Sequence, residues 1–172
     1  VKVMQCVYAL ALSKDGSLEK QQKFLNQSIA QTYTLYLLML ALLRELHQTA
    51  MERVEKGSQK YLKGAEVKNN PKRLAGNRIL HLISENPQLR ETLKKRKLKQ
   101  WYLNEEYVKI LLKELFDSDL YRDYVGKPDT FQEDREFLIQ AFREIIAPND
   151  KVYEFLEDEG ITWVDDIPLV NT

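Results

Sequence analysis

Apolar residues recur every three or four positions along nearly the whole chain, and this spacing is the feature that most restricts the fold. Such a period places the apolar side chains on one face of an α-helix. No segment alternates apolar and polar residues between hairpin turns, as the strands of a half-buried sheet do. The sequence therefore predicts an all-α helical bundle.

The most apolar segment runs from Tyr33 to Leu43 and is apolar on all sides of a helix. It ends at Arg44, well short of the ~20 residues that a membrane-spanning helix needs. We therefore expect a buried central helix and no membrane partner. The single cysteine, Cys6, excludes an intramolecular disulfide and fits a reducing compartment, so we expect a cytoplasmic protein.

Local signals set the expected helix ends. Thr130 and Glu133 form a capping box, in which each side chain satisfies a backbone amide that the helix leaves unpaired. Asn86, Asn104 and Ser118 are each placed to cap the helix that follows. The expected helices cover residues 1–12, 18–54, 74–83, 87–98, 105–116, 119–126 and 131–147, and one more ends at Gly160.

Charge is uneven although the chain as a whole carries 26 basic and 26 acidic side chains. Residues 60–99 hold 12 basic and 3 acidic side chains, whereas residues 100–172 hold 7 and 18. With the helix pattern, this divides the chain into an N-terminal helical bundle (1–55), a basic helical insertion (56–103) and the first part of a C-terminal helical bundle (104–172).

The basic insertion has two interpretations. In the first, Lys72, Arg73, Arg78 and the cluster Lys94–Lys99 contact RNA phosphates, which release counterions when they are neutralised. In the second, these charges form a solvated helix face or lie against the acidic helices of the same chain. Trp101 and Tyr102 follow the cluster and are of a type that stacks on single-stranded bases, but we expect this pair to be core.

No catalytic centre is recognisable in the residue pattern. His47 and His81 lack neighbours at metal-ligand spacing, the glycines are isolated, and Cys6 has no nearby base. Neighbouring carboxylates in the acidic third point in different directions on a helix. We therefore expect a protein that is not an enzyme and that uses no cofactor and no metal.

Two segments resemble the NusB family of bacterial transcription antitermination factors. Val3–Ala9 is similar to the family's first helix, in which a Gln lies three residues before a Tyr. Phe131–Leu169 is similar to the start of its C-terminal half, with Asp134-Arg135-Glu136-Phe137 opening a helix and Trp163-Val164-Asp165-Asp166-Ile167 after Gly160. Together the two segments cover less than a third of the chain. The remainder, with its basic insertion, is similar to an extended form of the family.

The resemblance implies an all-α NusB-like fold and a function without catalysis. NusB proteins bind the boxA sequence of ribosomal RNA transcripts together with NusE, a ribosomal protein, and act on the transcription elongation complex. By position, Lys2, Gln5 and Tyr8 correspond to the family's RNA-binding helix, and Asp165 and Asp166 to its NusE-binding surface. For Tyr8 the alternative is packing, with the hydroxyl at the rim of an apolar face.

Two departures from the family concern the ends of the chain. The Arg-rich start of the family's first helix would lie before Val1, and the ending that packs the second bundle would lie after Thr172. We therefore expect further residues on both sides. Two other functions remain open at this point: a helical protein-interaction scaffold without RNA binding, and a NusB-like RNA-binding domain of a ribosomal RNA methyltransferase.

Overall fold

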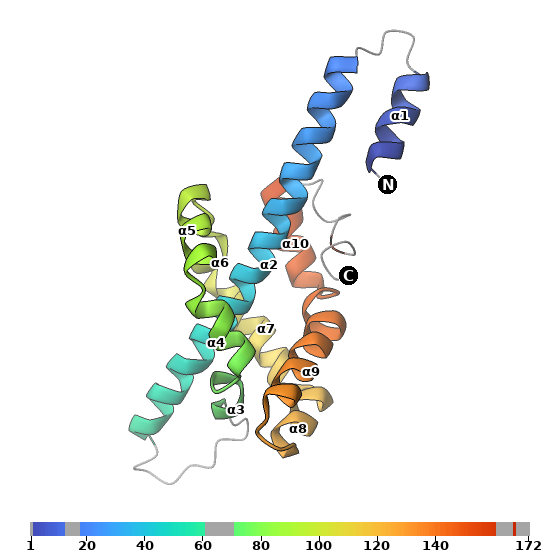
Figure 1. The fold of residues 1–172 in the computed structure, drawn as a ribbon. Helices are drawn as coiled ribbons and strands as arrows, with labels where there is room; N and C mark the ends of the chain where they lie inside the picture. The colour runs from blue at the N-terminus through green and yellow to red at the C-terminus, as the bar shows by residue number, and fades with distance from the viewer. Residues whose placement is uncertain (1, 13–17, 61–70, 161–166, 168–172) are drawn as a thin grey trace.

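The computed structural model describes residues 2–12, 18–60, 71–160 and 167 (Figure 1). These residues form α-helices and one π-helical turn, and they contain no strand. The elements are α1 (Lys2–Leu12), α2 (Leu18–Lys60), α3 (Lys72–Ala75), α4 (Arg78–Glu85), α5 (Pro87–Arg96), α6 (Gln100–Leu103), α7 (Glu105–Asp117), α8 (Asp119–Gly126), α9 (Phe131–Ala141), the turn η2 (Phe142–Ile146) and α10 (Asp150–Gly160). The all-α prediction is confirmed.

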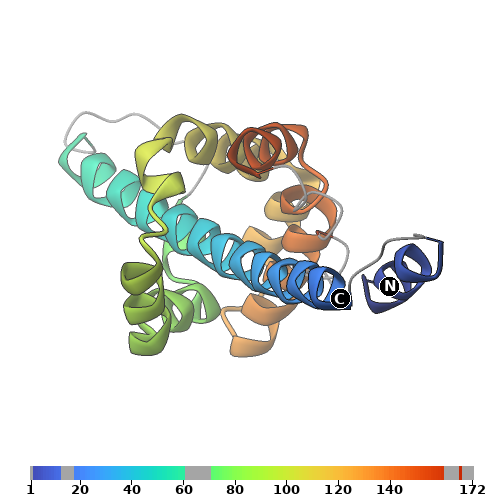
Figure 2. The same cartoon turned by 90° about the horizontal axis from the view of Figure 1, so that it is seen from above.

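Helix α2 is the axis around which the other helices pack. Its 43 residues contact α1 and all five helices from α3 to α7. Leu35, Leu38 and Leu42 are fully buried, as the apolar sequence around them predicts. Figure 2 shows α4 and α5 on one side of α2, and α7 and α10 on the other.

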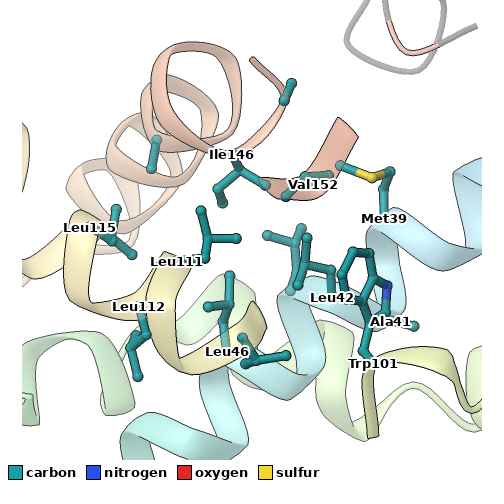
Figure 3. Close-up of a cluster of buried hydrophobic side chains, with 14 of the residues drawn as sticks. Met39, Ala41, Leu42, Leu46, Trp101, Leu111, Leu112, Leu115, Ile146 and Val152 are labelled. Carbon is teal, nitrogen blue, oxygen red and sulfur yellow. The ribbon is translucent and has the colours of Figure 1, made fainter. Parts of the chain in front are cut away.

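The helices of the basic segment belong to the same core as the rest of the molecule. Figure 3 shows Leu42 and Leu46 of α2 pointing toward Leu111 of α7 and Ile146 of η2. Trp101 of α6 lies beside them, 2 % exposed, and its indole Nε1 donates a hydrogen bond to the Leu38 carbonyl at 2.8 Å. The described helices of residues 72–103 are therefore packed into the bundle and do not stand apart from it.

Three of the four expected capping side chains are confirmed, but the capping box is only half formed, because the Thr130 amide donates to the Pro128 carbonyl and not to Glu133. The side chains of Asn86, Ser118 and Thr130 accept hydrogen bonds from the backbone amides of the third residue after them. Asn104 does not cap α7, because its side-chain amide donates to the carbonyl of Gln100, in the preceding turn. That cap prediction is wrong.

Two expected helices are interrupted. The segment expected as one helix over 74–83 is two helices, α3 and α4, and the break lies where Asn77 caps α4 by accepting from the amides of Ile79 and Leu80. The helix expected over 131–147 is α-helical to Ala141 and continues as the π-helical turn η2.

Candidate nucleic-acid interface

A buried carboxylate joins the two halves of the bundle. Asp134 of α9 is 0 % exposed and accepts hydrogen bonds from the Tyr124 hydroxyl at 2.7 Å and from the Arg78 backbone amide at 3.1 Å. Arg78 Nη1 lies 3.0 Å and Arg73 Nη2 3.2 Å from its oxygens. Asn77 donates to both the Tyr124 hydroxyl and the Asp134 carbonyl. This network, which we call the Asp134 clamp, holds α3 and α4 against α8 and α9.

Two of the predicted RNA-binding residues are therefore paired inside the chain. The Arg73 side chain is 11 % exposed, lies 4.3 Å from the Tyr124 ring centroid and donates to Asp129 at 2.7 Å. That hydrogen bond is the main reason that the pKa of Asp129 is lowered. Arg78 is 44 % exposed and also contacts Asp129. Lys72 lies exposed at the start of α3, and phosphate binding by these three residues stays a prediction.

The basic cluster at the end of α5 is on the surface. Lys94, Lys95, Arg96, Lys97 and Lys99 are all exposed. Lys95 pairs with Glu91 of its own helix at 2.8 Å, and among the described residues the other three lysines form no ion pair. The structure thus favours a solvent-facing cationic surface over one that lies against the acidic helices.

Exposed aromatic side chains lie next to this cluster. The Arg96 guanidinium lies 4.7 Å from the ring centroid of Tyr33 on α2, and its Nη1 donates to Thr34 at 3.3 Å. Tyr33 and Tyr36 stack at 6.4 Å and are 44 % and 46 % exposed. Tyr102 is 65 % exposed, so the core prediction is right for Trp101 and wrong for Tyr102.

A half-open cleft of about 380 Å³ lies between α2, α5 and α6, beside the cluster. Its lining residues are Ala41, Arg44, Glu45, Leu93, Leu98, Lys99, Trp101 and Tyr102. Burial raises the pKa of Glu45, and the nearby Arg44 partly opposes this shift. Sequence reasoning missed this cleft, because Arg44 stands in the sequence only as the end of an apolar run. The available signal was that Arg44 and Glu45 are the first charged residues after the uncharged segment 24–43.

The candidate residues on α1 lie elsewhere. Figure 1 shows α1 beside the N-terminal part of α2, away from α3 and α4, so the two predicted RNA-binding sets are not brought together. Lys2 and Gln5 belong to α1, and Tyr8 is 68 % exposed. The exposed neighbours of Tyr8 include the apolar Met4 and Val7. Asp165 and Asp166 lie outside the described residues.

The histidines have packing roles. His47 is 2 % exposed, and its two ring nitrogens lie 3.0 Å from Ser84 Oγ and from the Ala75 carbonyl. Burial lowers the pKa of His47. His81 approaches it edge-on at 6.1 Å between ring centroids. Within the described ranges, no group of three or more His, Cys, Asp or Glu side chains is arranged to hold a metal ion.

No helix in the described part of the chain is both long and apolar enough to cross a membrane. Comparisons with protein-family models, with curated proteins and with solved structures found no match to this chain.

Proposed function

We propose that this chain is a cytoplasmic RNA-binding protein that acts as a NusB-type transcription antitermination factor. The observation that carries the proposal is the exposed cationic cluster Lys94–Lys99 at the end of α5, with the exposed Tyr33 beside Arg96 and the exposed Tyr102 beside Lys99. Cations and aromatic rings on one surface are the usual combination for single-stranded RNA.

The chemistry of the surface supports RNA over an anionic protein partner. Lys94, Lys97 and Lys99 form no ion pair with any residue that the structure describes, so they can neutralise phosphates, and each neutralised phosphate releases a counterion. Tyr33, Tyr36 and Tyr102 present ring faces on which bases stack irrespective of sequence. An acidic protein surface would pair with the lysines but would leave these rings without a complementary partner.

The resemblance to the NusB family supports the specific RNA sequence and the protein partners in this proposal. It supplies boxA as the RNA sequence, and NusE and the elongation complex as the partners. Lys2, Gln5 and Tyr8 on α1 are a second, separate RNA contact in this scheme, and Asp165 and Asp166 are the contact with NusE. A basic ribosomal protein suits an acidic pair by charge complementarity.

A protein-interaction scaffold is the second candidate, because one surface favours it. Helix α1 and the start of α2 expose Met4, Tyr8, Leu18, Phe24 and Ile29, all at least half exposed. Several large apolar side chains exposed on two neighbouring helices are more than scattered surface residues and favour a protein interface. In this case the α1 surface binds a protein and the α5 surface has no RNA partner.

The test is binding of a boxA-type RNA and of a scrambled control across a salt series, with and without NusE. We expect affinity to fall steeply with salt, and the preference for boxA to increase when NusE is present. The variant K94Q/K97Q/K99Q should reduce the slope of log affinity against log salt by about 2, because each phosphate contact to a single strand contributes roughly 0.7.

The matched control is K20Q/K23Q/K113Q, which removes three exposed lysines elsewhere and changes the net charge equally. We expect this control to keep the parent salt slope. Equal effects of the two triple variants would show that the α5 cluster is not a specific contact. Weak binding to both RNAs that NusE does not change would reject the antitermination proposal in favour of the scaffold.

A further inference from the structure

The cleft between α2, α5 and α6 contains a combination of side chains that neither the fold nor the basic cluster requires. Glu45 lines the cleft together with apolar and cationic residues, and its side chain is 20 % exposed. Outside this lining, the carboxylates of Glu52 and Glu105 are near enough to add to the effect of burial in raising its pKa. Arg44 Nη1 is 3.8 Å from Glu45 Oε1, outside hydrogen-bonding distance, and the Arg44 side chain is 39 % exposed. The carboxylate is therefore only weakly paired and still has hydrogen-bond acceptor capacity.

A half-buried carboxylate of this kind selects for hydrogen-bond donors. An ionised carboxylate accepts hydrogen bonds and donates none, and its two oxygens match two parallel N–H groups. On the Watson–Crick edge, guanine offers adjacent N1–H and N2–H donors. Adenine and cytosine offer one donor beside an acceptor, and the single donor of uracil lies between two carbonyls. Guanine is thus the base that a carboxylate in a cleft matches best.

We propose that this cleft binds a guanine base of single-stranded RNA, with Glu45 accepting its N1–H and N2–H groups and Tyr102 stacking on its ring. This inference rests on the RNA-binding function proposed above. The cleft volume of about 380 Å³ lies within the range of roughly 300–1,000 Å³ that small-molecule sites occupy. Leu93, Leu98 and Trp101 provide the apolar part of the lining against which a base can be buried.

The same surface provides a path for the RNA backbone. Lys99 and Arg44 line the cleft, so two cations lie beside a bound base for contact with its neighbouring phosphates. Along α2, Tyr33 lies eight positions before Ala41, which corresponds to a helical rise of about 12 Å. At that distance Arg96 lies over Tyr33 and offers the next stacking surface. A strand anchored in the cleft can therefore extend along α2 toward the tyrosines.

The experiment compares short oligouridine RNAs that carry one central guanosine, adenosine or cytidine, and oligouridine alone, by fluorescence anisotropy with the full chain. We expect the guanosine RNA to bind at least about tenfold more tightly than the others, which is within the discrimination of one bidentate base contact. Glu45→Gln should remove this preference, because an amide presents one acceptor and one donor to two donors. Tyr102→Ala should weaken all four RNAs, and Tyr102→Phe should not.

The matched control is Glu55→Gln, which removes an exposed carboxylate from the same helix and should keep the preference. Salt-dependent binding of all four RNAs with equal affinity would overturn the guanine site and leave the proposed RNA-binding function standing. A guanosine preference that persists in Glu45→Gln would also overturn it. Absence of binding to any RNA would overturn both proposals together.

Discussion

Removal of the Asp134 carboxylate should lower the free energy of unfolding by an amount that its contacts allow us to predict. Asp134 is fully buried and contacts the Tyr124 hydroxyl, the Arg78 amide, the Arg78 guanidinium and the Arg73 guanidinium at 2.7–3.2 Å. Asp134→Ala leaves the partly buried Arg73 without its interior counter-charge and opens a cavity between α4 and α9. Breaking a buried ion pair in this way costs about 3–5 kcal/mol in free energy of unfolding.

This loss is large for a chain of 172 residues. The total stability of a domain is typically about 5–15 kcal/mol, so the variant should lose roughly a fifth or more of it. Each kcal/mol shifts Tm by about 2–4 °C at this size, which gives an expected decrease of roughly 6–20 °C. Urea unfolding followed by circular dichroism measures the free energy, and calorimetry measures the Tm.

The control is Asp123→Ala, which removes an exposed carboxylate from α8 and changes the net charge by the same amount. We expect this control to change stability by no more than about 0.5 kcal/mol. A loss below about 1 kcal/mol in Asp134→Ala would refute the reasoning, because the Asp134 clamp would then hold Arg73 and Arg78 only weakly. They would again be available as phosphate ligands.

Three further predictions concern the Trp101 hydrogen bond, the Thr130 cap and the partly buried Glu45 carboxylate. Trp101→Phe removes the hydrogen bond to the Leu38 carbonyl and should cost about 1 kcal/mol in urea unfolding, and an unchanged midpoint would contradict the contact. Thr130→Ala removes the N-cap of α9 and should also cost about 1 kcal/mol, whereas Thr130→Ser should restore most of it. Burial raises the pKa of Glu45 above 4.5, so the folded state holds this proton more tightly than the unfolded state. Ionised Glu45 therefore destabilises the fold above its raised pKa, and this penalty disappears as pH falls toward 4.5. Glu45→Gln should raise the Tm at pH 7, with a gain that shrinks toward pH 4.5, and a lower Tm at pH 7 would reject this account.

The Glu45 prediction links stability to function. A carboxylate that destabilises the fold is typical of a residue that serves binding, since binding sites often carry a stability cost. Glu45→Gln should therefore increase stability and reduce guanine preference in the same protein. If Glu45→Gln increased stability but left the guanine preference unchanged, Glu45 would have no role in RNA binding.

Sequence reasoning was most accurate where the physical cause is local. Side chains at Asn86, Ser118 and Thr130 cap the amide three residues later, and such a contact depends on almost nothing outside the helix start. The same reasoning failed at Asn104, whose side-chain NH2 group donates to the Gln100 carbonyl of α6 while its oxygen accepts no hydrogen bond from an amide of α7. The π-helical turn after Ala141 has no signal in the sequence.

The amino-acid sequence by itself determined the helices, the buried middle of α2 and the uneven charge, because helix formation and burial follow from the apolar period along the chain. Only the tertiary structure decided which charged side chains are paired inside the chain and which are exposed to solvent. Arg78 and Asp134 are 56 residues apart and meet because α4 packs on α9, whereas the α5 cluster reaches solvent because no acidic helix covers it among the described residues. Pairing of a charge depends on what lies across an interface, and local sequence does not encode that.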